Sequence, residues 1–594
     1  MSYNQFCLVC GGTGCESSKA DLIYQNLLKA CETHGLKDSV QVVKTGCFGF
    51  CEKGPIVKAL PDDSFYVEVK PEDAERIVAE HFVKGRPVKD LLYHSGGQAA
   101  KGEGDIKFYQ KQLRIVLRNC GVINPENIDE YIARDGYAAL EKVLFKMNPE
   151  DVIAELKVSG LRGRGGAGFP TWLKWQSTRQ SPGDQKYVIC NADEGDPGAY
   201  MDRSTLEGDP HSVLEAMTIA GYTMDASKGF IYIRAEYPLA IQRLEIAIDQ
   251  SRELGLLGKD ILGSGFDFDI QIRLGAGAFI CGEETALIQS IEGKRGMPVP
   301  KPPFPSESGL WGRPTSINNV ETFANVPVII NKGGAWFASI GTETSKGTKV
   351  FALTGAINNS GLVEVPMGTT LREIIYDIGG GIKDGKGFKA VQTGGPSGGV
   401  ITKDYLDTPI DYESLTRLGS MMGSGGMIVM DDEDCIIDVV KFYLAFSVEE
   451  SCGKCAPCRI GGRKLLEILE KITKGDGTME DLEQLKKIGK AMKNASLCML
   501  GGTTPNPVMS TLNYFYDEYL AHIKDGKCPA GKCKSLITYE IDKEKCIGCT
   551  VCARKCPVPC IAGERKAPHE IDQSKCIKCG ACFDACKFGA VKVS

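Results

Sequence analysis

Two cysteine runs between residues 546 and 586 repeat one spacing, C-x₂-C-x₂-C-x₃-C. Thiolates at this spacing hold 4Fe–4S clusters, and the fourth cysteine of each run ligates the cluster of the other run. The spacing therefore predicts two clusters with crossed ligands. The first set is Cys546, Cys549, Cys552 and Cys586, and the second is Cys576, Cys579, Cys582 and Cys556. Lys587 stands where proline is usual, which changes a turn but removes no ligand.

A third group joins three closely spaced cysteines to a distant one. Cys452, Cys455 and Cys458 lie at steps of three, and Cys498 follows in a later helical stretch. Such a set can hold a 4Fe–4S cluster between the ends of helices in a bundle. Zinc is the alternative occupant for four cysteines.

A fourth group lies near the N-terminus. Cys10 and Cys15 come from one predicted loop, and Cys47 and Cys51 from another. Two pairs of thiolates can supply the four ligands of one 2Fe–2S cluster. The pattern resembles the thioredoxin-like ferredoxins. Disulfides are a poor explanation in a large chain that shows no secretory signal.

Some cysteines remain outside these four groups. Cys528 and Cys533, in KCPAGKCKS, are spaced like a metal knuckle. Cys560 and His569 lie between the two ferredoxin-type runs, and together the four could close a tetrahedral zinc site. His522 is a rival nitrogen ligand. The alternative is that Cys528 and Cys533 are merely buried or pair with each other.

The stretch Leu161–Trp175, LRGRGGAGFPTWLKW, suits a different ligand. Its glycines allow a close approach of the backbone and offer bare amides to an anion. These glycines are Gly163, Gly165, Gly166 and Gly168, and the charged and flat side chains among them are Arg162, Arg164, Lys174, Phe169 and Trp172. A phosphate-bearing aromatic ligand would fit, although a structural glycine turn is an equal alternative on the glycines alone.

The same stretch resembles the flavin loop of the NADH-binding subunit of respiratory complex I. Three later runs match in the same order, namely Asn191–Arg203, Gly275–Gly296 and Lys301–Thr322, and the resemblance extends over about residues 124–502. The domains on either side of this core resemble those of the flavin subunits of soluble multimeric hydrogenases, including electron-bifurcating ones, and of NAD-dependent formate dehydrogenases. The resemblance also favours iron–sulfur over zinc at Cys452.

The resemblance implies roles for individual residues. Those expected around the phosphate and ribityl groups of FMN are Gly163, Arg164, Gly165, Gly166 and Lys174. Those expected to make polar contacts to the flavin are Asn191, Asp193, Glu194, Asn318, Asn319 and Thr322. Those expected on the nucleotide side are Gly282, Glu283 and Glu284, with Phe169 and Phe304 on either side of the adenine. No general acid or base is implied, because hydride transfer needs positioning, here by Glu284 and Glu194.

Asp196 departs from the complex I pattern, which has glutamate at this point, in contact with the ribose of NADH. Aspartate keeps the charge and is one methylene shorter. A carboxylate there accepts hydrogen bonds from ribose hydroxyls and repels a 2′-phosphate. We therefore expect NADH to be preferred over NADPH.

Alternating short apolar strands and helices predict a multidomain α/β protein. The strands expected around the flavin are residues 188–189 and 230–233, followed by a helix at 238–251. The expected domains are a thioredoxin-like 2Fe–2S domain (1–95), a linker (96–109), a Rossmann-like FMN- and NADH-binding domain (110–335), a β-grasp domain of the SLBB type (345–425), a helical bundle with a 4Fe–4S site (431–524), a linker with the zinc site (525–545) and a two-cluster ferredoxin (546–594).

Composition excludes several classes of protein. The 594 residues are 42% hydrophobic and 25% charged, with a net charge of −6. This balance gives no reason to expect binding to nucleic acid or to a membrane surface. The sequence shows no membrane-spanning run and begins without a basic-then-apolar signal, so we expect a cytoplasmic protein.

The expected function is an NAD(H):acceptor oxidoreductase subunit that holds FMN, one 2Fe–2S cluster, three 4Fe–4S clusters and a zinc ion. The expected partners are a hydrogenase catalytic subunit, a small thioredoxin-like 2Fe–2S subunit and a soluble ferredoxin, within a higher oligomer. Electron bifurcation is expected from the hydrogenase resemblance. The alternatives are a flavin subunit of a formate dehydrogenase and, from another class, a flavin-free electron-transfer adaptor.

Overall fold

The computed structural model describes residues 3–95, 98–100 and 102–593, so residues 96, 97 and 101 of the predicted linker lie outside the described residues. The chain forms two compact units. The first comprises Met1–Lys386 and Ala390–Val429, and the second Gly387–Lys389 and Met430–Ser594.

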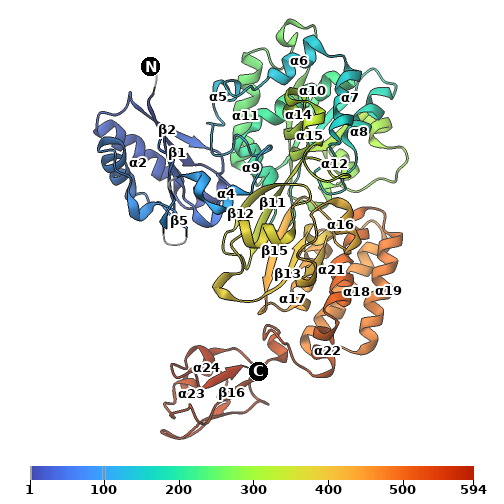
Figure 1. Ribbon diagram of the computed structural model, residues 1–594. Coiled ribbons are helices and arrows are strands. Elements are labelled where there is room, and N and C mark those ends of the chain that lie inside the picture. The colour runs from blue at the N-terminus through green and yellow to red at the C-terminus, as the bar shows by residue number, and fades with distance from the viewer. Residues whose placement is uncertain (1–2, 96–97, 101, 594) are drawn as a thin grey trace. The chain divides into compact units, whose positions relative to one another are not determined.

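The N-terminal part of the first unit is a four-stranded sheet in the order β2-β1-β3-β4 (Figure 1). β1 (Gln5–Cys10) runs parallel to β2 (Val40–Thr45) and antiparallel to β3 (Val57–Leu60), which pairs with β4 (Ser64–Tyr66). α2 (Ala20–Thr33) packs its apolar face on the sheet through buried side chains such as Ile23 and Leu27. The helix predicted at 20–34 and the strand predicted at 39–44 are confirmed.

A parallel sheet in the order β10-β7-β8-β9 follows. Its strands are β7 (Tyr187–Ala192), β8 (Lys228–Arg234), β9 (Asp269–Gly275) and β10 (Thr315–Asn319). They are rich in β-branched and aromatic residues, and the central strands β7 and β8 are almost wholly buried. In a sheet of this kind, ligands bind beyond the carboxyl ends of the strands.

Helices cover this sheet (Figure 1). α10 (Pro210–Met224) and α14 (Val320–Lys332) are buried along most of their length and contact each other. The other principal helices are α6 (Ala138–Lys146), α7 (Pro149–Ser159), α8 (Thr171–Gln180), α9 (Met201–Gly208), α11 (Pro238–Glu253) and α12 (Glu284–Ile291). The strands predicted at 188–189 and 230–233 lie within β7 and β8, and the predicted helix 238–251 lies within α11.

A five-stranded mixed sheet in the order β12-β11-β15-β13-β14 forms the next domain. Its strands are β11 (Thr348–Gly355), β12 (Gly361–Pro366), β13 (Phe388–Thr393), β14 (Gly399–Thr402) and β15 (Gly426–Asp431). β11 is antiparallel to β12 and parallel to β15, and the predicted helix 371–378 contains a π-helical turn at Glu373–Ile378.

The second unit begins with helices and ends in short strands. The helices are α17 (Ile436–Glu449), α18 (Ala456–Lys474), α19 (Met479–Ala495), α20 (Met499–Thr503), α21 (Asn506–Tyr514) and α22 (Tyr516–Lys524). After them β16 (Tyr539–Ile541) pairs with β19 (Val591–Val593), and β17 (Ile561–Ala562) with β18 (Glu570–Ile571). Across the described ranges, no helix combines the length and apolar character that crossing a membrane requires.

Candidate functional site

The glycine-rich loop lies between α7 and α8, at the edge where β10 ends. The Gly163 amide donates to the Phe169 carbonyl at 2.8 Å, which closes the loop on itself. Gly166 has a φ of 121°, and a Cβ there would lie 3.2 Å from the Gly423 backbone. Gly168 has a φ of 64°, and its Cβ would lie 2.8 Å from the Tyr412 ring. These two glycines are therefore required by the packing of the loop as well as by its backbone angles.

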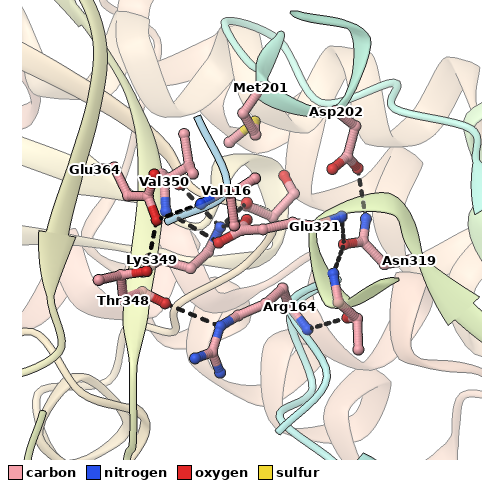
Figure 2. A network of polar contacts seen from close by, with 12 residues as sticks. Val116, Arg164, Met201, Asp202, Asn319, Glu321, Thr348, Lys349, Val350 and Glu364 are labelled. Atoms are coloured by element: carbon pink, nitrogen blue, oxygen red, sulfur yellow. Dashed lines mark hydrogen bonds and ion pairs between the residues drawn. The ribbon is translucent and has the colours of Figure 1, made fainter. Parts of the chain in front are cut away.

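Arg164 is wholly buried, and its guanidinium is used within the protein. It donates to the carbonyls of Arg162, Lys346 and Thr348 at 2.9, 2.7 and 3.1 Å, as Figure 2 shows for Thr348. The Arg164 amide donates to the Thr322 hydroxyl at 2.8 Å. The side chain thus fixes the loop to β11, and it is not the free cation for a phosphate that the expected flavin role implies.

A buried ion pair lies beside this loop (Figure 2). The Lys349 ammonium contacts the Glu321 carboxylate, and the two side chains are 0% and 2% exposed. Glu321 also accepts from the Val350 amide at 3.0 Å, while Lys349 donates to the carbonyls of Val350 and Ser424 at 2.9 and 2.6 Å. The pair joins α14, which starts just after Asn319, to β11.

Glu364 extends the same network toward the start of the domain. It accepts from the amides of Val116 and Leu117, each at 2.9 Å, and from the Thr348 hydroxyl at 2.6 Å. Segments far apart in the sequence are thus joined around the flavin loop by buried, fully engaged polar groups. Such networks favour a single rigid arrangement.

Lys174 and Glu284 meet at the carboxyl end of β10. The Lys174 ammonium donates to Glu284 at 3.2 Å and to the Ile317 carbonyl at 3.0 Å, and Lys301 contacts the other Glu284 oxygen at 2.6 Å. Burial acts to raise the pKa of Glu284, but the two lysines outweigh it and hold the pKa below its usual value. Glu283 caps α12 by accepting from the amides of Thr285 and Ala286.

The run after β7 brings further acids to this edge. Glu194 accepts from the amides of Asp202 and Arg203 at 3.1 and 3.0 Å and so caps α9. Burial raises the pKa of Glu194 to about 7 and that of Asp202 well above its usual value. Asn319 donates to Asp202, and the Asn191 side chain donates to the Gly282 carbonyl at 2.8 Å.

Several buried polar atoms around this edge have no hydrogen-bond partner among the described residues. They are Asp202 Oδ1, Arg203 Nε and Arg234 Nη1. A polar ligand would complete the hydrogen bonding of atoms that are otherwise costly to bury. These residues, together with the glycine cradle, therefore fit a flavin with a phosphate-bearing tail.

Asp196 lies farther along the run that follows β7. Its carboxylate accepts from the Ser424 hydroxyl, and a Cβ on Gly395 would lie 2.9 Å from it. Burial raises the pKa of Asp196 to about 6. The rings of Phe169 and Phe304 are 49% and 53% exposed, so both have a free face for an adenine.

The N-terminal cysteines line one cavity as the spacing predicts. Cys10, Cys15, Cys47 and Cys51 come from the two loops that follow β1 and β2. The Gly49 amide donates to Cys47 Sγ at 3.3 Å, and a Cβ on Gly54 would lie 2.8 Å from Cys15 Sγ. The glycines thus leave room around the sulfurs, and the set fits a small iron–sulfur cluster.

The bundle cysteines gather at helix starts. Cys455 and Cys498 are the residues that immediately precede α18 and α20. Cys458 lies in the first turn of α18, and a Cβ on Gly501 of α20 would lie 2.8 Å from its Cβ. The Ser451 hydroxyl is 3.2 Å from Cys458 Sγ. Helix starts favour the negative charge of a thiolate-bound cluster.

The C-terminal cysteines line two cavities with the predicted crossing. One cavity is lined by Cys546, Cys549, Cys552 and Cys586, and the other by Cys556, Cys576, Cys579 and Cys582. Cys560 also lines the second cavity, with its Sγ 3.3 Å from Cys556 Sγ, and His569 lines the first. Cys560 and His569 therefore belong to the ferredoxin region.

The zinc prediction needs correction in two of its four ligands. Cys528 and Cys533 meet Cys435 and His522, and the four candidate ligand atoms lie within 4.8 Å of one another, all buried. His522 Nε2 is 3.5 Å from Cys435 Sγ and 3.4 Å from Cys533 Sγ, while Nδ1 contacts the Glu518 carbonyl at 2.7 Å. The rival nitrogen ligand is thus the one in place. Sequence spacing missed Cys435, because only folding brings it to His522 and Cys533, which are 87 and 98 positions away.

Comparisons with known proteins agree with this arrangement. Family models match for the Nuo51 FMN-binding domain over residues 156–328, the SLBB domain over 350–401, the iron–sulfur binding region of NADH-ubiquinone oxidoreductase-F over 438–522, and a 4Fe–4S binding domain over 569–592. The multidomain α/β prediction is confirmed at this level.

Individual relatives agree as well. The chain is 63% identical to the NADP-reducing hydrogenase subunit HndC of Solidesulfovibrio fructosivorans over 81% of this chain and 98% of that one. It is 45% identical to an F-type NADH-quinone oxidoreductase subunit of Rhizobium meliloti over 70% of this chain and 99% of that one. Among solved structures, an NAD⁺-reducing [NiFe]-hydrogenase in its H₂-reduced state matches with a TM-score of 0.63 and 28% identity over 88% of this chain and 85% of that one. The chain belongs to the family of FMN-binding F-type subunits of NADH-quinone oxidoreductases and their hydrogenase relatives.

Proposed function

We propose that the chain is the NAD(H)-oxidising and -reducing subunit of a cytoplasmic hydrogenase complex. The observation that carries this proposal is that a flavin- and nucleotide-type site and four cysteine-lined sites occur in one chain. The similarity to HndC, named as a subunit of a hydrogenase, supports the choice of complex.

FMN, when bound, would accept hydride from a nicotinamide and release electrons singly to iron–sulfur clusters. The protein's own part is to position and to exclude water. Gly163, Gly165 and Gly166 would present backbone amides, and Lys174 would supply the free positive charge for the phosphate. Glu194 and Glu284 would hold the site's polar edge in place, since both are already fixed by hydrogen bonds.

We further propose one 2Fe–2S cluster at Cys10, Cys15, Cys47 and Cys51, and three 4Fe–4S clusters at the remaining sets. The other parts of the proposed complex are a hydrogenase catalytic subunit, a small 2Fe–2S subunit and a soluble ferredoxin. Electron bifurcation by that complex remains part of the proposal.

For the nucleotide we propose NADH over NADPH, on the charge of Asp196. HndC is named as part of an NADP-reducing enzyme, so the preference needs a direct test. A comparison of initial rates with the two nucleotides and an artificial acceptor would decide it.

A zinc ion is proposed at Cys435, His522, Cys528 and Cys533. Three sulfurs and one imidazole nitrogen are a usual tetrahedral donor set, and the Glu518 carbonyl accepts from Nδ1 and so leaves Nε2 for the metal. Elemental analysis should find one zinc per chain, lost in a Cys435→Ser, Cys533→Ser variant while iron stays constant. Zinc retained in that variant, or iron lost instead, would contradict the assignment.

Purification of the chain from its source, with its partners, tests the proposed function. Flavin released by acid, together with NADH-dependent reduction of a viologen, supports the oxidoreductase. Clusters without flavin would instead indicate an electron-transfer adaptor, and co-purification with a molybdenum-containing subunit would indicate a formate dehydrogenase.

A further inference from the structure

The loop that carries Cys47 and Cys51 packs against α9, the helix that directly follows the flavin-contact run. The Thr13 amide donates to Glu207 of α9 at 3.1 Å. A Cβ on Gly46 would lie only 2.3 Å from the Cα of Gly208, so the two backbones touch. The N-terminal cysteine site is therefore placed against one end of α9.

A second contact fixes the same loop from the β-grasp domain. The Leu362 amide donates to the Gly49 carbonyl at 2.7 Å, and the Glu52 amide donates to the Ser360 carbonyl at 3.1 Å. Glu52 also accepts from Lys383 at 3.1 Å. With backbone bonds on both sides of Cys51, the position of its sulfur is well defined.

Tyr200, the residue before α9, reaches this sulfur. Its hydroxyl and the Cys51 thiol are side-chain hydrogen-bond partners, and the thiol here stands for a thiolate that ligates iron. Burial and the nearby cysteine raise the pKa of Tyr200 well above its ordinary value, so the phenol keeps its proton. The guanidinium of Arg203 lies 5.9 Å from the centre of the Tyr200 ring.

The flavin-contact run holds Tyr200 in position. Glu194 accepts from the amides of Asp202 and Arg203 and so fixes the first turn of α9, which Tyr200 precedes. Tyr237 donates to the Glu194 carbonyl at 2.6 Å and also lies 5.3 Å from the Arg203 guanidinium. The segment that would contact the flavin thus ends in the group that contacts Cys51.

We propose that Tyr200 donates a hydrogen bond to the Cys51 sulfur and thereby raises the reduction potential of the N-terminal cluster, making it an easier acceptor for electrons from the flavin site. The inference rests on the proposed 2Fe–2S cluster. Its physical basis is that reduction adds one electron to the cluster, so a donor to a ligating sulfur stabilises the reduced state more than the oxidised state. The hydroxyl keeps its proton, and no bond is formed or broken.

The test is a redox titration of the 2Fe–2S signal, followed by electron paramagnetic resonance in the full chain. Tyr200→Phe removes the hydroxyl and keeps the ring. We expect the one-electron equilibrium to shift about tenfold toward the oxidised cluster, which equals a potential lower by about 59 mV. Tyr109→Phe is the matched control, because that buried hydroxyl donates to the Phe48 carbonyl at 3.0 Å and not to a sulfur.

A second variant covers the case in which Tyr200→Phe folds poorly. Difluorotyrosine at position 200 keeps the shape and is a stronger donor, so the potential should rise. A shift below twofold in both variants, or an equal shift in Tyr109→Phe, would overturn the inference. A wild-type chain without any 2Fe–2S signal would overturn the cluster assignment and the inference together, whereas a normal signal with no shift would overturn the inference alone.

Discussion

Replacement of Lys349 by methionine should destabilise the flavin domain strongly. Methionine keeps most of the length of the side chain and removes the ammonium. Glu321 would then be a buried carboxylate with one remaining donor, the Val350 amide at 3.0 Å. The carbonyls of Val350 and Ser424 would lose the donor they now share.

The magnitude follows from the burial of the pair. Loss of one partner from a buried ion pair costs roughly 3–5 kcal/mol, because the other charge is left uncompensated. Loss of an exposed pair costs about 0.2–1 kcal/mol. Arg372→Met is the matched control, since Arg372 and Asp407 form a bidentate pair in the same domain with side chains 50% and 75% exposed.

The assay is urea unfolding of the FMN-loaded chain, followed by the rise in flavin fluorescence as the domain opens. Because a chain of several domains does not unfold in one step, only the flavin-reporting transition is compared. A Lys349→Met, Glu321→Leu double variant should recover part of the loss, as the isolated carboxylate is gone. A cost below about 1 kcal/mol for Lys349→Met, equal to that of Arg372→Met, would refute the reasoning.

The other predictions concern cofactors, nucleotide, electron route and pH. A fully reconstituted chain should contain about fourteen iron atoms, 2 + 3 × 4, by colorimetric assay, and a value near six would contradict the ferredoxin assignment. Asp196→Asn should narrow the ratio of NADH to NADPH rates, since the repulsive charge is lost at constant size; an unchanged ratio would count against that role. Cys498→Ala should leave FMN reducible by NADH but stop reduction of the C-terminal clusters, seen by spectroscopy; undiminished transfer would reveal another route. Glu194 has a pKa raised to about 7, so the folded state binds more protons than the unfolded state between about pH 4.5 and 7. Its contribution to stability should therefore fall by about 3 kcal/mol as pH rises through this window, and Glu194→Gln should flatten the fall in pH-dependent unfolding.

Much of the fold could be predicted because local patterns agree with tertiary structure. The apolar runs 188–189 and 230–233 are the buried cores of β7 and β8. The cysteine cavities of the ferredoxin region also follow from spacing, since short loops hold each run together. In these places, neighbours in sequence are neighbours in space.

The remainder depended on contacts that sequence spacing does not encode. Cys435 joins His522 and Cys533 only because α17 and α22 pack in the same bundle. Arg164 carries a charge suited to phosphate, yet its guanidinium is taken by three backbone carbonyls from distant segments. A side chain's type limits what it can bind, while the surrounding backbone decides what it does bind.

The crossed cavities of the ferredoxin region have a consequence for how that region could be built. Neither cysteine run lines a complete cavity, because Cys586 completes the first and Cys556 the second. A fragment with only one run would therefore offer three thiolates where four are needed. The two halves resemble repeats in sequence but are not separable modules, so cluster insertion must follow or accompany the pairing of both halves. A lesion at Cys556 would damage the site formed mainly by the other half, and an ancestral single run would have needed a second copy of itself to form a complete site.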